Sequence, residues 1–334
     1  MTNNLAASLH LGDGLPVSPL GFGGMALTPV YGEVDLAEAL RTLHHAVDAG
    51  ISFIDTADIY GGGNNEELIA QLLRDRRGEV QLATKFGLVG SPSTGYSDIR
   101  GDAAYVKAAV DRSLQRLGTD VIDLYYMHRR DVRVPISETV GAMAELVEQG
   151  KVRHLGLSEV TADELREAST IHPIAAVQSE WSIWSRDVER NVVPAAAELG
   201  VGFVPYSPLG RGFLTGTVDA SQLGENDFRR KIPRFAEGAL DANQQVVAAV
   251  QSVASELASS PAQVALAWLL AHGTRLGLPV VPIPGTRKAR RIDENLGALA
   301  LELTPTQLET LDAAADAVVG SRSADPQWVS QGRE

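Results

Sequence analysis

The stretch of sequence that decides the fold runs Phe53-Ile54-Asp55-Thr56-Ala57-Asp58-Ile59-Tyr60, and the glycines Gly61, Gly62 and Gly63 follow it. A short apolar run that turns polar and then glycine-rich is typical of a buried strand that opens into a loop. Such a strand delivers its last side chains to a cleft. We therefore expect Asp55 and Tyr60 to lie together at that cleft.

The rest of the chain alternates between helical and strand-like stretches from residue 35 onward. This alternation favours a parallel sheet covered by helices. With residues 20–23 counted as the first strand there are eight, which favours a closed (β/α)₈ TIM barrel of the α/β class over an open doubly wound sheet. The expected helices are 35–49, 66–74, 103–117, 136–149, 162–170, 188–199, 244–257 and 261–272, and the strands after the one at residue 53 are 80–85, 121–127, 152–157, 174–178, 202–205 and 279–283.

A competing architecture is suggested by Gly21-Phe22-Gly23-Gly24-Met25-Ala26, which formally matches the dinucleotide-binding fingerprint of an open sheet. That fingerprint works by opening a helix whose N-terminus faces pyrophosphate. Here residues 28–32 (Thr-Pro-Val-Tyr-Gly) continue as a loop. We therefore prefer a strand end whose glycines let the backbone approach closely.

The composition fits one globular domain, residues 1–334, with a hairpin at about 8–19. A chain of 334 residues with 44% hydrophobic content can bury a full core. Cysteine is absent, which excludes disulfides and thiolate zinc sites. The N-terminus lacks a signal-peptide pattern, no apolar run reaches membrane-spanning length, and the net charge of −13 disfavours nucleic acid and anionic lipid as partners. We expect a cytoplasmic protein.

Three polar residues, Asp55, Lys85 and His128, each end an apolar strand-like run. In a (β/α)₈ barrel the carboxyl ends of the strands form the active-site mouth, so these side chains should converge. Taken singly, each has an ordinary structural explanation, as a loop cap, a solvated lysine or a hydrogen-bonded histidine. Lysine is nevertheless scarce in this arginine-rich chain, and a lysine at the end of a buried strand indicates a need for a compact, tunable ammonium.

Together with Tyr60, these residues form a set that can handle a proton. The pKa of a free tyrosine, about 10, is too high for easy proton exchange at neutral pH, and an adjacent ammonium stabilises the phenolate form. We expect Lys85 to act on Tyr60 in this way, while Asp55 keeps the lysine charged and oriented. His128 would hydrogen-bond a substrate oxygen. Carbonyl reduction needs this chemistry, because hydride arriving at carbon creates an alkoxide that must receive a proton. No metal is required, and the histidines show no HExxH-type pair.

Five segments in order carry a family resemblance. They are residues 50–61 (Gly-Ile-Ser-Phe-Ile-Asp-Thr-Ala-Asp-Ile-Tyr-Gly), 83–85 (Ala-Thr-Lys), 123–128 (Asp-Leu-Tyr-Tyr-Met-His), 206–212 (Tyr-Ser-Pro-Leu-Gly-Arg-Gly) and 283–287 (Ile-Pro-Gly-Thr-Arg) through 294–296 (Glu-Asn-Leu). Over nearly its full length the chain resembles the aldo-keto reductases. The resemblance implies a barrel whose bottom is closed by the hairpin, with extra helices at 244–257 and 305–317. It also implies that Asp55, Tyr60, Lys85 and His128 form the catalytic tetrad, with Tyr60 as proton donor.

The resemblance further implies a site for NADPH or NADP⁺. Ser158 and Gln178 would hydrogen-bond the nicotinamide carboxamide, and Tyr206 would stack against its ring. The long loop at about 207–241 would cover the coenzyme. The full set that we expect to contact it is Gly24, Met25, Asp55, Ser158, Glu159, Gln178, Tyr206, Ser207, Leu209, Gly210, Arg211, Gly285, Thr286, Arg287, Arg291, Glu294 and Asn295.

Two parts of this coenzyme site stand out. A basic cluster at residues 287–291 lies in an otherwise acidic chain, and the planar fork of Arg287 or Arg291 suits the 2′-phosphate of NADP. After Ser158 most family members have asparagine, whereas this chain has Glu159, as in one bacterial and plant branch. That departure leaves the role of Glu159 open.

The sequence therefore predicts an NADP-dependent oxidoreductase that reduces small-molecule aldehydes or ketones. Histidine at position 128 predicts attack on carbonyls, because family members that reduce conjugated carbon–carbon double bonds have glutamate there. Two other classes stay open: an NADPH-binding sensor or regulatory subunit without turnover, and a phosphate-binding aldolase with Lys85 as Schiff base. Side chains that we expect to shape the substrate pocket are Met25, Tyr31, Phe86, Trp181 and, in a C-terminal loop at about 318–334, Trp328.

Overall fold

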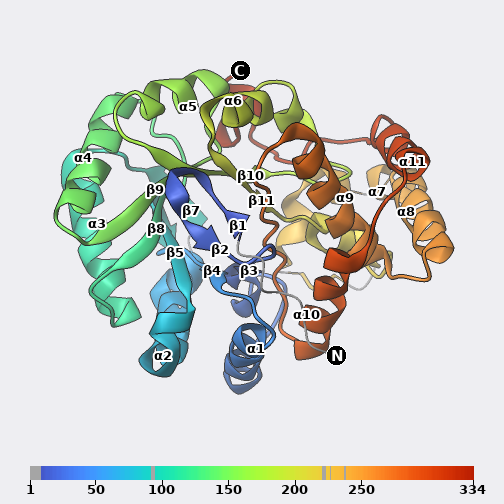
Figure 1. The fold of residues 1–334 in the computed structure, drawn as a ribbon, viewed down its shortest axis with the longest axis horizontal. Coiled ribbons are helices and arrows are strands. Elements are labelled where there is room, and N and C mark those ends of the chain that lie inside the picture. Colours follow the sequence, from blue (N-terminus) through green and yellow to red (C-terminus); the bar gives the residue numbers. More distant parts are fainter. Residues whose placement is uncertain (1–8, 92–94, 220–222, 226, 237) are drawn as a thin grey trace.

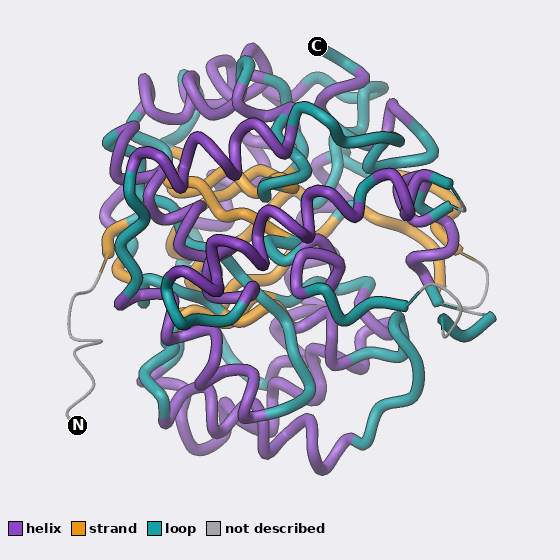
Figure 2. Tube along the Cα trace, turned by 90° about the vertical axis from the view of Figure 1, so that its right-hand side faces the viewer, coloured by secondary structure: helices purple, strands orange, loops and turns teal. Residues whose placement is uncertain are grey.

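A parallel barrel forms the centre of the computed structural model, which describes residues 9–91, 95–219, 223–225, 227–236 and 238–334. Seven strands hydrogen-bond in the order β11-β10-β9-β8-β5-β4-β3, and every neighbouring pair is parallel. Figure 2 shows these strands enclosed by helices. The strands are β3 (Phe22–Gly23), β4 (Phe53–Asp55), β5 (Gln81–Phe86), β8 (Ile122–Met127), β9 (Val152–Ser158), β10 (Ile174–Glu180) and β11 (Gly202–Tyr206).

The eighth position in the barrel is filled by an extended segment, residues 279–285. On one side Val281 N donates to Phe203 O at 2.9 Å, and on the other Gly21 N donates to Pro282 O at 2.9 Å. Three of the seven residues in this segment are prolines, which have no N–H to donate, so the regular ladder is interrupted. The segment nevertheless joins the two edges of the sheet. The predicted (β/α)₈ architecture is confirmed, and the open sheet suggested by the glycines at 21–24 is excluded.

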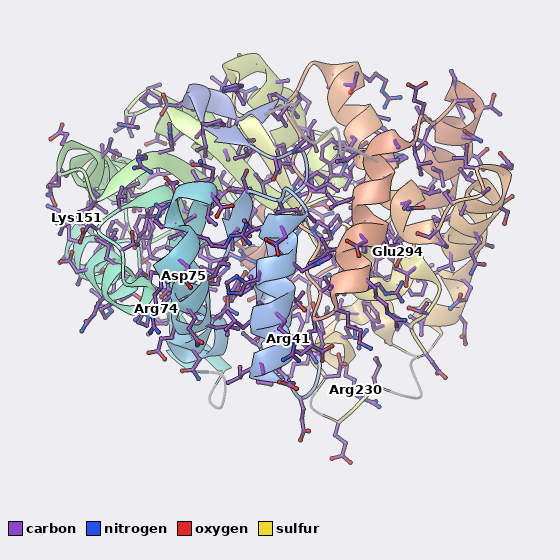
Figure 3. The ribbon with its side chains drawn as sticks, turned by 60° about the horizontal axis from the view of Figure 1, so that its bottom comes forward. Arg41, Arg74, Asp75, Lys151, Arg230 and Glu294 are labelled. Carbon is purple, nitrogen blue, oxygen red and sulfur yellow. The ribbon has the colours of Figure 1, made fainter. Side chains whose placement is uncertain are left out.

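Helices cover the outside of the barrel. Their inward faces are apolar, as in α1, which buries Leu43 and Val47, while their outward faces are charged, as at Arg41 and Arg74 in Figure 3. Figure 1 shows α8 and α11, the two extra helices, side by side at the periphery. The helices are α1 (Leu36–Asp48), α2 (Asn64–Arg76), α3 (Ala103–Leu117), α4 (Ile136–Glu148), α5 (Ala162–Ser169), α6 (Val192–Leu199), α7 (Ala239–Ala242), α8 (Gln244–Glu256), α9 (Pro261–Leu276), α10 (Ala289–Leu296) and α11 (Pro305–Ala315).

The bottom of the barrel is closed by the hairpin of β1 (Leu9–His10) and β2 (Pro16–Val17). Leu11 and Leu15, in its turn, belong to the same buried cluster as the residues inside the barrel. The fit is tight, because a Cβ added at Gly202 would lie 2.3 Å from a methyl carbon of Leu11. This hairpin was predicted.

A second hairpin, of β6 (Leu88–Ser91) and β7 (Gly95–Ile99), follows β5 and was not predicted. It arises between the third and fourth barrel strands, at the carboxyl end of β5. Its residue Leu88 lines the cavity described below. Within the described parts of the chain, none of the helices is long and apolar enough to cross a membrane.

Candidate active site

Asp55, Lys85 and Tyr60 meet above the carboxyl ends of β4 and β5. Lys85 Nζ lies 2.5 Å from Asp55 Oδ1, 2.7 Å from the carbonyl oxygen of Thr56 and 3.4 Å from the hydroxyl of Tyr60. The lysine is fully buried and Asp55 is 2% exposed. The ammonium therefore connects a carboxylate to a phenol, as the sequence predicted.

The position of Tyr60 depends on the glycines that follow it. Tyr60 begins a short 3-10 turn, Tyr60–Gly63, in which Gly61 and Gly62 have φ angles of 61° and 67°. This left-handed conformation is open to glycine at little cost. The turn carries the chain from the end of β4 into α2, and it leaves the phenol facing the same cavity as Asp55.

His128 follows β8 directly and completes the cluster. Its ring packs edge-on against Tyr60, with 5.8 Å between the ring centroids. Burial lowers the pKa of His128 well below its usual value, and the charges of Arg129 and Lys85 add to this effect. The imidazole is therefore neutral at neutral pH. Its Nδ1 has no hydrogen-bond partner in the described structure.

Burial also opposes both charges of the Asp55–Lys85 pair. Desolvation raises the pKa of Asp55 and lowers the pKa of Lys85, while the attraction between the two groups counteracts each shift. Asp55 receives a further hydrogen bond from the amide of Gln178, 2.9 Å long. Because Gln178 lies on β10, this bond links the proton-handling cluster to the side of the barrel where the coenzyme is expected.

A cavity of about 600 Å³ opens above these residues. Its wall includes Ser158 and Gln178, at the ends of β9 and β10, and Tyr206 at the end of β11. The cavity thus offers hydroxyl and amide donors, an aromatic face and the loop that begins at Ser207, a set that fits a nicotinamide coenzyme. Of the predicted site residues, those that line the cavity are Met25, Asp55, Tyr60, His128, Ser158, Gln178, Tyr206, Ser207, Leu209, Arg211 and Gly285.

Glu159, predicted as a coenzyme contact, is fully buried and does not line the cavity. Its carboxylate accepts hydrogen bonds from Arg322 (2.8 and 3.0 Å), the hydroxyl of Tyr206 (2.8 Å) and the backbone N–H of Ser330 (3.0 Å). Although burial opposes its charge, the guanidinium of Arg322, the charge of Arg129 and the hydrogen bond from Ser330 hold the pKa of Glu159 well below its usual range. The residue fastens the C-terminal segment to the end of β9.

The basic cluster lies at the start of α10, and none of its residues lines the cavity. Arg287 donates to the backbone carbonyls of Ala26 (2.8 Å) and Glu33 (2.7 Å), so it also braces the loop after β3. Arg291 pairs with Glu294, which is labelled on α10 in Figure 3. Among the described residues, the predicted coenzyme contacts that do not line the cavity are Gly24, Glu159, Gly210, Thr286, Arg287, Arg291, Glu294 and Asn295, and the predicted catalytic residue Lys85 does not line it either.

Sequence reasoning missed several charged residues of the cavity wall. Arg129 lies next to His128, Glu180 pairs with Arg211 at 2.8 Å, and Arg322 joins Glu159 to Asp187. Of these residues, only Arg129 could have been predicted from the sequence, because it directly follows His128 at the end of a strand.

Two expectations about pocket shape are wrong. Phe86 and Trp181 are fully buried in the layer between barrel and helices, where Phe86 stacks on Tyr125 and Trp181 packs on Phe203. Met25, Tyr31 and Trp328 do line the cavity. Within the described ranges, no three histidine, aspartate or glutamate side chains gather as a metal site.

The family model described as "Aldo/keto reductase family" matches residues 19–316. The chain therefore belongs to the aldo-keto reductases, oxidoreductases that reduce carbonyl groups and generally bind a nicotinamide coenzyme. It is 44% identical over 316 residues to probable aldo-keto reductase 1 of Glycine max, covering 93% of this chain and 89% of that relative.

Solved structures agree with this assignment. The glycerol dehydrogenase AKR11B4 from Gluconobacter oxydans superimposes with a TM-score of 0.83 at 26% identity, covering 96% of this chain and 97% of that one. The holo form of aldo-keto reductase AKR11C1 from Bacillus halodurans gives a TM-score of 0.75 at 27% identity, covering 95% and 99%.

Proposed function

We propose that this protein reduces aldehydes and ketones to alcohols with NADPH, and that Tyr60 donates the proton. The observation that carries the proposal is the arrangement around Lys85 Nζ, which touches Asp55 and Tyr60 at once beside a neutral, buried His128. All but the lysine line one cavity, so a single substrate can reach them.

Each side chain has a defined part in this reaction. A bound NADPH supplies the hydride. Tyr60 gives its hydroxyl proton to the oxygen that becomes an alkoxide, and the ammonium of Lys85 stabilises the phenolate that remains. Asp55 keeps Lys85 charged against the effect of burial, while neutral His128 hydrogen-bonds the carbonyl oxygen and orients it.

The coenzyme would be held on the β9–β11 side of the cavity. Ser158 and Gln178 can bond the carboxamide, and Tyr206 can stack against the ring. The hydrogen bond from Tyr206 to Glu159 fixes that ring in place, so we assign Glu159 to the support of the site and not to direct contact. The 2′-phosphate would lie against Arg287 and Arg291.

The test is NADPH oxidation measured against a panel of aldehydes, ketones and quinones. We expect turnover of simple aldehydes, and with enones we expect attack at the carbonyl, because His128 is not a strong acid. Turnover of enones only at their carbon–carbon bonds would contradict the role of His128. Tight binding of NADPH with no turnover of any carbonyl would favour a sensor.

A further inference from the structure

A buried arginine without a carboxylate partner lies in the wall of the active-site cavity. Arg129 is 9% exposed, and among the described residues no acidic side chain forms an ion pair with it. The other arginines of the wall are paired: Arg211 with Glu180, Arg229 with Asp227, and Arg322 with Glu159. Arg129 is therefore the exception among them.

The contacts of Arg129 leave part of its guanidinium unused. Its Nη1 donates to the carbonyl oxygen of His128 (2.7 Å) and to the hydroxyl of Ser158 (3.3 Å). Its Nε is enclosed without a hydrogen-bond partner, and the described structure gives no hydrogen bond to Nη2. The Arg129 charge also acts on the buried carboxylate of Glu159, which does not line the cavity, but no hydrogen bond joins the two. The guanidinium therefore keeps hydrogen-bonding capacity that a ligand can use, and a buried polar group without a partner is unfavourable.

The surroundings of Arg129 are aromatic. The guanidinium carbon lies 5.4 Å from the ring centroid of Trp328 and 6.0 Å from that of Tyr206. Leu88 lines the same cavity and belongs to a small apolar cluster against which Trp328 packs. A ligand here would meet an apolar wall and one fixed positive charge.

The acidic residues of the wall would not prevent an anion from binding. Asp55 is paired with Lys85 and Glu180 with Arg211, and Asp325 is exposed at the protein surface. The planar fork of an arginine matches the two oxygens of a carboxylate. Arg129 and His128 line the same cavity, so one ligand can present a carboxylate to the first and a carbonyl to the second.

We propose that Arg129 selects carbonyl substrates that carry a carboxylate close to the carbonyl group, of the 2-oxo acid class, with an apolar or aromatic body. This inference rests on the proposed carbonyl reduction and names its substrate class. In the reaction the carbonyl carbon gains the hydride and its oxygen gains the proton of Tyr60. The product is the 2-hydroxy acid, and its carboxylate takes no part in the bond changes.

The test compares phenylglyoxylate with its methyl ester, which differ in the negative charge. In Arg129→Met the KM for the acid should rise roughly 10- to 100-fold, the effect of losing a hydrogen bond to a charged group, while the KM for the ester changes much less. Arg129→Lys keeps the charge but lacks the planar fork, so its KM for the acid should lie between those of the wild type and Arg129→Met. Lys231→Met, which removes an exposed cation at the same cavity, controls for general attraction of anions.

Binding without turnover separates this inference from the proposed function. Phenylglyoxylate is titrated calorimetrically into the NADP⁺ complex, which has no hydride to give. Binding in the wild type that is weakened in Arg129→Met supports the inference even if the enzyme reduces nothing. No binding in the wild type, or equal losses for acid and ester, overturns it. A weaker affinity for NADPH with an unchanged acid-to-ester ratio would place Arg129 in the coenzyme site. If Arg129→Met fails to fold, Arg129→Lys carries the same comparison.

Discussion

Lys85 is the residue on which the chemistry of the site depends. Its ammonium is fully buried, and burial lowers its pKa, so its charge relies on Asp55 at 2.5 Å. The same ammonium is 3.4 Å from the hydroxyl of Tyr60. A neutral side chain of similar length would remove the charge that stabilises the phenolate and would leave Asp55 buried and unpaired.

Lys85→Met should therefore lower both turnover and stability. We expect kcat to fall about 100-fold or more, because general acid catalysis usually contributes that much, and the free energy of unfolding to fall by about 3–5 kcal/mol. The double variant Asp55→Asn/Lys85→Met should recover stability but not turnover. Denaturant unfolding and steady-state kinetics measure the two effects, with Lys107→Met at the surface as control. Full turnover in Lys85→Met would refute this role.

His128 should give the protein a measurable dependence of stability on pH. Its folded pKa lies well below the unfolded value of about 6.5, so the unfolded state binds a proton more readily. The free energy of unfolding is therefore not reduced by protonation of His128 above pH 6.5, and it decreases as the pH falls from 6.5 toward the folded pKa. Unfolding curves between pH 7.5 and 5 should be less pH-dependent in His128→Asn than in the wild type. Identical slopes would contradict the burial of a neutral imidazole.

At the level of single residues, the cluster was predictable because Asp55, Lys85 and His128 each end an apolar strand-like run, and Tyr60 stands in the polar, glycine-rich loop that follows the first of these runs. The partners of Glu159 were not predictable. Arg322 lies 163 positions away from Glu159, and the local sequence around either residue does not indicate their ion pair. Long-range pairing of this kind is decided by the path of the C-terminal segment, which has little regular structure.

The C-terminal segment is held to the barrel by charge. Arg322 donates to Glu159 and to Asp187, and Arg333 pairs with Glu164 at 3.1 Å. The segment also supplies Trp328 to the cavity wall. Loss of the buried Glu159–Arg322 pair should therefore loosen the segment and open the substrate side of the cavity.

Glu159→Gln tests this attachment. Removing one partner of a buried ion pair costs about 3–5 kcal/mol, whereas Glu198→Gln, at an exposed pair with Arg166, should cost less than about 1 kcal/mol. The folded pKa of Glu159 is depressed, so its stabilisation is present above the unfolded pKa of about 4.3 and is lost as the pH falls through the folded value. The stability of the variant should not show this decrease at acid pH. Proteolysis should remove the C-terminal segment of the variant faster than that of the wild type. Equal cleavage rates would argue against the attachment.

The start of α10 is where coenzyme preference should be decided. Arg287→Ala combined with Arg291→Ala should weaken NADPH far more than NADH, because only NADPH carries the 2′-phosphate. Arg290→Ala, an exposed neighbour in the same cluster, is the matched control. Fluorescence titration measures both affinities. Similar losses for the two coenzymes would point to the bracing of the loop at Ala26 and Glu33 as the main role of Arg287.

For the molecule as a whole, alternation of helix and strand was enough to predict the barrel, since eight parallel strands have few ways to close. The last strand was predicted at 279–283, but its irregular hydrogen bonding and the β6–β7 hairpin were not. The prolines at 279, 282 and 284 interrupt the hydrogen bonds of this strand without preventing closure, so the segment completes the barrel without a regular ladder. The second hairpin lies between β5 and α3, a stretch in which the sequence predicted neither a helix nor a strand.

Carbonyl reduction by this barrel, with Tyr60 as the acid, is tested most directly at position 60. Phenylalanine at position 60 keeps the ring but removes its proton. The measurement is a stopped-flow single turnover, in which protein loaded with NADPH is mixed with a reactive aldehyde and the loss of NADPH absorbance is followed. We expect a full turnover in the wild type, a rate about 10²- to 10⁴-fold lower in Tyr60→Phe, and equal NADPH affinity in both. Equal rates in the two proteins would contradict the role of Tyr60 as the acid, and a wild type that binds NADPH and oxidises none of it would contradict carbonyl reduction.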